Sequence, residues 1–408
     1  MALGLYISVP FCRTKCSFCN FASGVFSEAA FENYVARLTE DIASSRRLAG
    51  QFDCKLEATF DSIGDPIVDS IYLGGGTPSI LGPGQLGRIF AAARQHFAIT
   101  PDAEITVECA PGTLSATLID SLLQCGVNRV SLGVQSFVDR EAHSVGRLHN
   151  REIVLDEIRR LREDGLDNIS IDLIAGLPHQ TAESWDFSVA ETIATGVPHA
   201  SVYMLEVDED SRLGSELIAG GARYHAHFVP DDDATADFYQ QACVMLKEAG
   251  IVQYEISNFA RGEGIGSKQS RHNLKYWTRQ PYIGFGVDAH SMLPSIKEKN
   301  QAVRFATPDS LDAYMNRRPY TITEVSRRAA MEEAFFLGLR LNRGIDLDGL
   351  SGEFGTEFAA ESTQLEAIRQ CVDDGLVEQR GATLRLTARG RLLSNEVFGR
   401  FLIGETMA

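Results

Sequence analysis

The chain has 408 residues, of which 44% are hydrophobic and 23% are charged, and its formal net charge is -17 at pH 7. This acidic balance argues against a nucleic-acid partner, because such partners are held by clustered Lys and Arg side chains. No run of about 18 apolar residues is available to form a transmembrane segment, and the amino terminus lacks a signal-like pattern. We therefore expect a cytoplasmic globular protein with one large and one smaller domain, or with two domains.

Short apolar runs predict β-strands in the first half of the chain. They lie near residues 5, 71, 105, 130, 170 and 202, and segments of helical length separate them. Strands that alternate with helices pair in parallel through crossover connections. A closed barrel needs eight such units, so the six units found here predict an α/β fold with an open partial (β/α)6 barrel over residues 1–220.

Two segments have clear helical patterns. The first begins at Ser27, a typical capping residue, and its apolar residues fall on one face: Ala30, Tyr34, Leu38 and Ile42. The second covers residues 230–250, with acids at its amino end and Gly250 just past its close.

The remainder of the chain predicts a barrel extension over residues 221–320 and a smaller carboxyl-terminal helical domain over residues 321–408. Within the latter, GLVEQRGATLRLTARG predicts a hairpin that turns on Arg380-Gly381. Helices followed by a hairpin favour a winged-helix-like module. The domain over residues 321–408 has more Asp and Glu than Lys and Arg. We therefore expect it to cover the barrel or to contact a partner. A purely structural packing role is the alternative.

Polar and glycine-rich stretches follow the predicted strands. The carboxyl ends of parallel strands meet at one rim, where active sites of such barrels lie. A single stretch of this kind is commonly a turn or a cap, but their joint placement favours a site. The stretches are a cysteine cluster after the first strand, Gly74–Pro78 after the second, Glu108 at the end of the third, Gly133–Phe137 at the fourth and Asp172–Pro178 at the fifth.

Three of the eight cysteines, Cys12, Cys16 and Cys19, lie in one short loop. Structural zinc usually takes four ligands in two close pairs, and no second pair occurs in the chain. An iron-sulfur cubane held by three Cys leaves one iron open to a substrate. The spacing therefore favours a cluster over zinc.

The Cys-x3-Cys-x2-Cys motif with Phe18 before the last Cys resembles the signature of radical S-adenosylmethionine (SAM) enzymes. Further stretches resemble the HemN/HemW branch, which contains oxygen-independent coproporphyrinogen III dehydrogenase and a heme chaperone. These stretches are YISVPFC, YLGGGTPS, RVSLGVQSF, GRLHN, ISIDLIAGLP, YEISNFA, HNLKYW and, near the carboxyl terminus, AFFLGLRLNRGIDL to LTARGRLL. The resemblance covers nearly the full chain.

This resemblance implies that Cys12, Cys16 and Cys19 hold a [4Fe-4S] cluster whose open iron binds SAM. Glycines allow close approach of a small ligand, and a carboxylate accepts hydrogen bonds from ribose hydroxyls. The implied contacts are Gly75, Gly76 and Thr77 at the methionine end of SAM, Glu108 at its ribose, and Tyr6, Phe18, Gln135, Arg147 and Asp172 at other positions. One electron from the cluster would cleave SAM.

Three features point to the chaperone side of the branch. The dehydrogenases have a fourth Cys where Phe21 stands here, and they have a longer extension before the first strand. The stretch HNLKYW matches the chaperone motif and implies heme as ligand, with His272 on the iron, Tyr276 and Trp277 beside it and His290 as a second contributor. The expected partner is a heme-acceptor protein, which could lie at a membrane. A dehydrogenase and a HemN-like methyltransferase are the alternatives.

The chain also departs from the family pattern. Ser8 stands where the family usually has His, and Val287-Asp288 replaces small residues before Ala-His. The stretch around residues 54–68, before the second strand, resembles an insertion. The first two departures could indicate an unusual substrate, and the insertion is unexplained.

Overall fold

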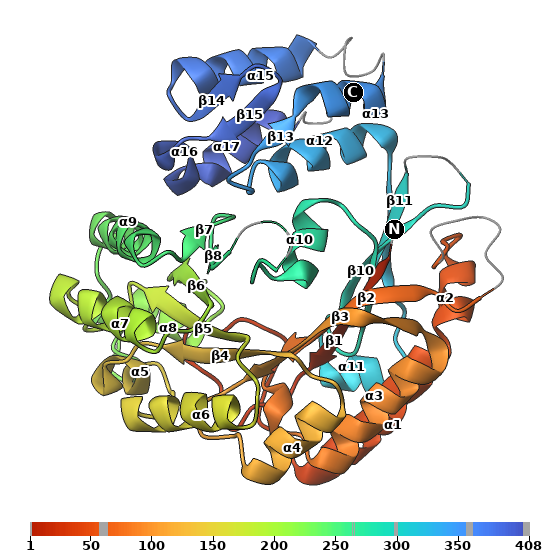
Figure 1. Cartoon of the computed structure of the whole chain (residues 1–408), viewed down its shortest axis with the longest axis vertical. Helices are drawn as coiled ribbons and strands as arrows, with labels where there is room; N and C mark the ends of the chain where they lie inside the picture. Colours follow the sequence, from red (N-terminus) through yellow and green to blue (C-terminus); the bar gives the residue numbers. More distant parts are fainter. Residues whose placement is uncertain are drawn as a thin grey trace.

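The computed structural model describes residues 2–56, 64–262, 264, 266–297, 301–355 and 362–402. Its centre is a curved twelve-stranded sheet with the order β12-β11-β10-β9-β1-β2-β3-β4-β5-β6-β8-β7 (Figure 1). The middle of this sheet consists of β1 (Leu3–Val9), β2 (Ile67–Gly75), β3 (Ala98–Cys109), β4 (Arg129–Gln135), β5 (Ile169–Ala175) and β6 (His199–Met204).

These six strands pair in parallel in chain order, and helices connect them on the outer side of the sheet (Figure 1). The connecting helices are α1 (Glu28–Ala43), α2 (Ser45–Gln51), α3 (Pro83–His96), α4 (Ala116–Gln124), α5 (Asp139–Ser144), α6 (Arg151–Glu163) and α7 (Ala182–Ala194). The expected α/β fold with an open partial (β/α)6 barrel is confirmed.

Further strands extend the sheet at both edges. Beside β6 lie the antiparallel strands β8 (Asn258–Ala260) and β7 (Val252–Gln253). Beside β1 lies β9 (Tyr282–Phe285), which is parallel to it. After β9 the sheet continues antiparallel through β10 (His290–Pro294), β11 (Ala302–Ala306) and β12 (Thr321–Val325).

Between the six parallel strands and the carboxyl-terminal part lie α8 (Arg212–Ala219), α9 (Asp232–Glu248), α10 (Arg271–Trp277) and α11 (Leu311–Met315). Helix α9 begins as expected, because the Asp231 side chain accepts a hydrogen bond from the Ala234 N–H at 2.8 Å. Gly250 follows its end with a φ of 75°. In α1, Ser27 occupies the cap position without a side-chain cap bond, and Phe31 rather than Ala30 joins the buried face.

Side chains alternate along the six parallel strands. The outward positions are apolar and buried against the helices, as Ile105 and Val107 are in β3. The inward positions are mostly polar, and register brings them into rows across the barrel. The inward residues include Tyr6, Ser8, Ser70, Tyr72, Thr106, Glu108, Arg129, Ser131, Ser170, Asp172, Ser201 and Tyr203. The lumen of the barrel is therefore polar, while the hydrophobic core lies between sheet and helices.

The carboxyl-terminal part contains helices around a small sheet of order β13-β15-β14. Its elements are α12 (Arg327–Gly338), β13 (Ile345–Asp346), α13 (Leu347–Phe354), α15 (Ser362–Asp373), β14 (Val377–Arg380), β15 (Thr383–Leu386), α16 (Ala388–Leu392) and α17 (Ser394–Phe401). The hairpin turns on Gly381-Ala382, one residue later than expected, because Arg380 pairs with Thr383. Gly381 has a φ of 60°, which two-residue hairpin turns favour.

Of the insertion around residues 54–68, residues 57–63 lie outside the described part. Cys54 forms an isolated antiparallel bridge with Ser295, and β2 begins at Ile67.

Candidate functional site

The cysteine loop between β1 and α1 is closed at its base by backbone hydrogen bonds. The Cys12 N–H donates to the Gly24 carbonyl at 2.9 Å, and the Gly24 N–H donates to the Pro10 carbonyl at 2.9 Å. Farther along, the Ser17 N–H donates to the Val145 carbonyl at 3.1 Å. The loop is thus held from both sides without using a cysteine side chain.

Each sulfur of the loop has a polar neighbour. The Thr77 hydroxyl lies 3.7 Å from the Cys12 sulfur, and the Cys19 sulfur lies 4.0 Å from the Ser23 hydroxyl. Burial raises the pKa of the Cys19 thiol. Among the described residues no group of three or more His, Cys, Asp or Glu is arranged to hold a single metal ion. A cubane binds each thiolate through a different iron, so its ligands need not converge on one point.

The glycines after β2 allow the chain to run against the cysteine loop. The Gly76 N–H donates to the Val9 carbonyl and the Thr77 N–H to the Phe11 carbonyl, both at 2.8 Å. A Cβ on Gly76 would lie 2.7 Å from the Phe11 carbonyl oxygen. Gly75 has a φ of 100°, a conformation that side chains disfavour. These glycines therefore let the chain after β2 pack directly against the cysteine loop.

Glu108 lies inside the barrel on β3. Its Oε1 accepts a hydrogen bond from the Tyr72 hydroxyl at 2.7 Å. Burial raises the pKa of the Glu108 carboxyl to about 7, and the nearby Asp172 adds to the shift. Tyr6, which pairs with Tyr72 across the strands, stacks on it with ring centroids 6.3 Å apart. The carboxylate expected at the SAM ribose therefore faces the lumen beside two aromatic rings.

Three further expected SAM contacts are Gln135 on β4, Asp172 on β5 and Phe18 in the cysteine loop. Gln135 ends β4 with a φ of 69°. Asp172 accepts hydrogen bonds from the Ser131 hydroxyl at 3.0 and 3.1 Å, and burial raises the pKa of its carboxyl. Phe18 packs against the small cluster that contains Val145.

A cavity of about 490 Å³ opens next to the cysteine loop. Three expected SAM contacts line it: Tyr6, Gly75 and Glu108. The positions where the sequence departs from the family pattern also line it: Ser8, Phe21, Val287 and Asp288. These four departures therefore lie together at one site.

Other cavity residues were not foreseen from the sequence. They are Ala22, Tyr72, Tyr203, Asn273 and Tyr282, which join the expected Tyr276 and His290. Tyr72 and Tyr203 occupy inward positions of β2 and β6. The period-2 alternation of polar and apolar residues in those strands was the signal that could have identified them.

His272, the expected heme ligand, is fully buried. Its Nδ1 lies 3.0 Å from the Ser70 hydroxyl and its Nε2 lies 2.9 Å from the Tyr276 hydroxyl. Burial lowers the pKa of the ring to about 3, so the imidazole is neutral. Trp277 lies under the Arg340 guanidinium, 4.2 Å from its ring centroid. The structure thus places His272 behind the cavity, whereas Tyr276 and His290 line it.

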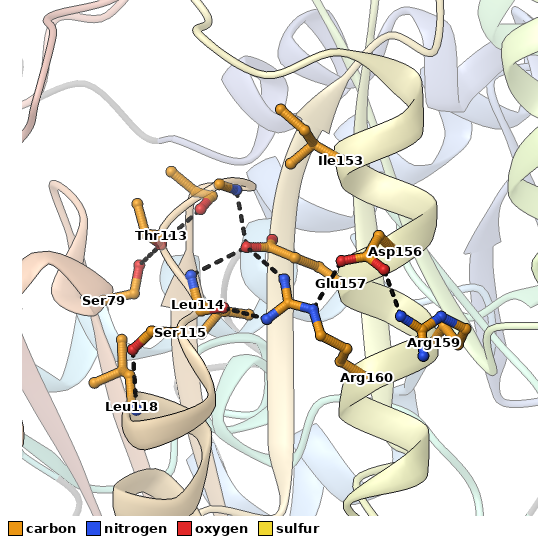
Figure 2. Close-up of polar contacts among 12 residues, drawn as sticks. Ser79, Thr113, Leu114, Ser115, Leu118, Ile153, Asp156, Glu157, Arg159 and Arg160 are labelled. Carbon is orange, nitrogen blue, oxygen red and sulfur yellow. Dashed lines mark hydrogen bonds and ion pairs between the residues drawn. The ribbon is translucent and has the colours of Figure 1, made fainter.

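Polar contacts join α6 to the loop that follows β3 (Figure 2). Glu157 of α6 accepts hydrogen bonds from the Gly112 N–H at 2.9 Å and the Leu114 N–H at 3.0 Å. Arg13 of the cysteine loop donates to the Gly112 carbonyl at 3.2 Å. Burial raises the pKa of the Glu157 carboxyl to about 7. The buried Glu157 carboxyl therefore fixes the loop around Gly112 and Leu114, and Arg13 donates to a carbonyl of that loop.

Within the described part of the chain, every helix is too short or too polar to cross a membrane.

Comparison with known proteins matches the observed fold. The model of the Radical SAM superfamily matches residues 6–189, and that of the HemN C-terminal domain matches residues 325–393. The solved structure of coproporphyrinogen III oxidase (HemN) from Escherichia coli, a radical SAM enzyme, has a TM-score of 0.80 and covers 98% of this chain and 90% of its own. Its sequence identity is 23%, so this likeness concerns the fold.

Full-length relatives are also found. The heme chaperone HemW of Bacillus subtilis is 31% identical over 400 residues, which cover 97% of this chain and 98% of that protein. The heme chaperone HemW of Lactococcus lactis is 30% identical over 400 residues, which cover 98% of this chain and 97% of that protein. On these full-length relatives and the two matching family models, the chain belongs to the HemN/HemW family of radical SAM proteins.

Proposed function

We propose that this protein is a heme chaperone that binds a [4Fe-4S] cluster, SAM and heme, and passes heme to an acceptor protein. The main support is the cavity beside the cysteine loop, which is lined by Gly75, Glu108, Tyr276, Tyr282 and His290. Full-length relatives named as heme chaperones support the same assignment. The proposal also includes that the protein acts in the cytoplasm and that the acceptor of the heme is a protein.

The residues of the cysteine loop fit the cluster. Arg147 brings a positive charge to the sulfur of Cys16, and its own buried Nε has no hydrogen-bond partner. Cys12, Cys16 and Cys19 would bind the irons. When bound and reduced, the cluster supplies the electron for reductive cleavage of SAM.

The barrel residues would bind and orient SAM. In this proposal, the backbone of residues 75–77 holds the methionine end and Glu108 accepts the ribose hydroxyls. The other proposed contacts are Tyr6, Phe18, Gln135, Arg147 and Asp172. Their common task is to hold SAM against the cluster loop and to exclude water from the lumen.

A paired assay on anaerobically reconstituted protein tests the proposal. We expect heme titration to give a saturable Soret band and incubation with coproporphyrinogen III, SAM and reductant to give no protoporphyrinogen IX. Formation of protoporphyrinogen IX would assign the dehydrogenase activity instead. Formation of S-adenosylhomocysteine with a methylated product would assign the methyltransferase.

A further inference from the structure

A second cavity, of about 500 Å³, lies between α6 and the loop that follows β3. Its lining residues are all different from those of the cavity assigned to SAM. Arg13 of the cysteine loop also lines it. Cavities of this size commonly hold small molecules, and this one lies against the loop that carries Cys12.

One oxygen of the Glu157 carboxyl has no hydrogen-bond partner. The residue lines the second cavity and is 1% exposed. Its Oε1 accepts the N–H groups of Gly112 and Leu114, whereas its Oε2 has no partner among the described residues. The Arg160 guanidinium also approaches Oε1, at 3.7 Å, and it donates to Asp156 and to the Leu114 carbonyl. A buried carboxylate oxygen without a donor is costly, so Oε2 is suited to accept a hydrogen bond from a bound cationic group.

Arg13 approaches the same loop residue from its carbonyl side. Its Nη1 donates to the Gly112 carbonyl at 3.2 Å, while the Gly112 N–H donates to Glu157. The Arg13 side chain is exposed. A guanidinium has five N–H donors, so one contact with a backbone carbonyl leaves a planar fork that can hold a carboxylate. A group for an anion and a group for a cation thus lie on the two sides of Gly112.

Apolar side chains belong to the same cavity. Leu114 and Ile153 both line it. Ile153 and Glu157 are four residues apart on α6 and project from the same face of that helix (Figure 2). A Cβ on Gly112 would lie 3.8 Å from Cγ2 of Ile153, so the loop packs close to this side chain. An apolar wall therefore lies next to the carboxyl whose Oε2 lacks a donor.

A free α-amino acid with an apolar side chain matches these three features. Its carboxylate would pair with Arg13, its ammonium would donate to Oε2 of Glu157, and its side chain would pack against Leu114 and Ile153. A carboxylic acid without an amino group would leave Oε2 without a donor. A phosphate would meet the carboxylates of Asp156 and Glu157, which repel it.

We propose that the second cavity binds a free α-amino acid with an apolar side chain, and that methionine is its ligand. The choice of methionine rests on the proposed function. In that function SAM accepts one electron, its bond between sulfur and C5′ breaks, and methionine and the 5′-deoxyadenosyl radical are formed. Because Arg13 directly follows Cys12 in the chain, the released methionine would act back on the loop that holds the cluster.

Isothermal titration of the full-length, cluster-loaded protein with L-methionine tests the site. SAM is present in excess and no reductant is added, so the SAM site stays filled and SAM is not cleaved. L-Norleucine, which has no sulfur, should bind with similar affinity. Arg13→Ala and Glu157→Gln should each weaken binding by about 10- to 150-fold, as expected for a lost hydrogen bond to a charged group. Glu163→Gln is the matched control, because Glu163 pairs with Arg159 on α6 and does not line the cavity.

Two analogues test each contact separately. Hexanoate lacks the ammonium group of norleucine, so Glu157→Gln and the wild type should bind it equally. Norleucine methyl ester lacks the carboxylate, so Arg13→Ala and the wild type should bind it equally. Analogue affinities that fall in both variants alike would overturn the assigned contacts.

The remaining outcomes separate this site from the proposed function. Wild-type protein that binds neither amino acid in the presence of SAM would overturn the inference. Variants that lose SAM affinity in the same proportion as norleucine affinity would also overturn it, because they would show a general change of the cysteine loop. Wild-type protein that assembles no iron-sulfur cluster but binds norleucine would overturn the proposed function and support the site.

Discussion

The guanidinium of Arg147 lies against the sulfur of Cys16, with Nη1 3.6 Å from Sγ. Its other terminal nitrogen donates to the carbonyl of Gly133 on β4. One side chain therefore connects the cysteine loop to the strand that carries Gln135 on the lumen side. A positive charge held at this place stabilises the more negative, reduced state of a bound cluster.

Replacing this arginine should affect both SAM and the cluster. We expect Arg147→Ala to weaken SAM binding by about 1.5–3 kcal/mol, the value of a hydrogen bond to a charged group. The cluster potential should become more negative, since a nearby positive charge is lost. Equilibrium binding of SAM and an EPR-monitored redox titration measure the two effects. Arg140→Ala, which removes an exposed arginine on α5, is the control. An unchanged SAM affinity in Arg147→Ala would show that Arg147 does not contact SAM.

Removal of the three cluster thiols should abolish the cluster but leave the fold. In the triple variant of Cys12, Cys16 and Cys19 to Ala we expect no brown chromophore and no SAM cleavage. The loop is closed by backbone hydrogen bonds, so the circular dichroism spectrum should be retained. Iron and sulfide analysis checks the result, with Cys243→Ala as the control. A full complement of iron and sulfide in the triple variant would contradict the assignment.

SAM affinity should depend on the ionisation of Glu108. Burial raises the pKa of this carboxyl to about 7, with Asp172 as the nearby charge and Tyr72 as its hydrogen-bond donor. The ribose hydroxyls need an acceptor, so SAM should bind more tightly as the pH rises through about 7. Glu108→Gln should bind more weakly by about 1.5–3 kcal/mol at high pH and lack this dependence. Isothermal titration from pH 6 to pH 8 on both proteins tests it, and parallel pH profiles would argue against the role.

Glu157 should make stability depend on pH. Burial raises the pKa of its carboxyl from 4.5 to about 7, so the folded state binds the proton more tightly than the unfolded state. The stability that this adds is fully present below pH 4.5 and is lost as the pH rises through about 7. Glu157→Gln retains an acceptor for the Gly112 and Leu114 N–H groups. Urea unfolding measures the free energy of unfolding of both proteins between pH 4.5 and pH 8. Over this range the value for the wild type should fall by up to about 3 kcal/mol relative to that for Glu157→Gln. An equal change of the free energy of unfolding with pH in both proteins would refute this.

The parallel strands were predictable because their outward residues form continuous apolar patterns in the sequence. The edge strands were not. Strands β7 to β12 are two to five residues long, and β9 joins β1 through pairs such as Gly4 with Tyr282. Such pairings depend on partners far away in the chain, and local sequence carries little information about them.

The cysteines and glycines of the site could be named from sequence because their spacing is local. Tyr72, Tyr203 and Tyr282 were not named, because their places at the cavity follow from strand register, as the pairing of Tyr72 with Tyr6 does. His272 shows the opposite case. Its motif identified the position, but whether the ring is exposed depends on how α10 packs against Ser70 on β2, which the motif does not encode.

Along the parallel strands, polar residues that face the lumen alternate with apolar residues that face the helices. The apolar residues stabilise the barrel, whereas the polar residues line the space where a ligand can bind. A change at Ile105 or Val107 alters the core, whereas a change at Ser8 or Tyr203 alters only the lining of the lumen. Substitutions of the second kind can accumulate without loss of the fold. A barrel built in this way can exchange one ligand for another over evolutionary time, and a chaperone and an oxidising enzyme can descend from the same scaffold.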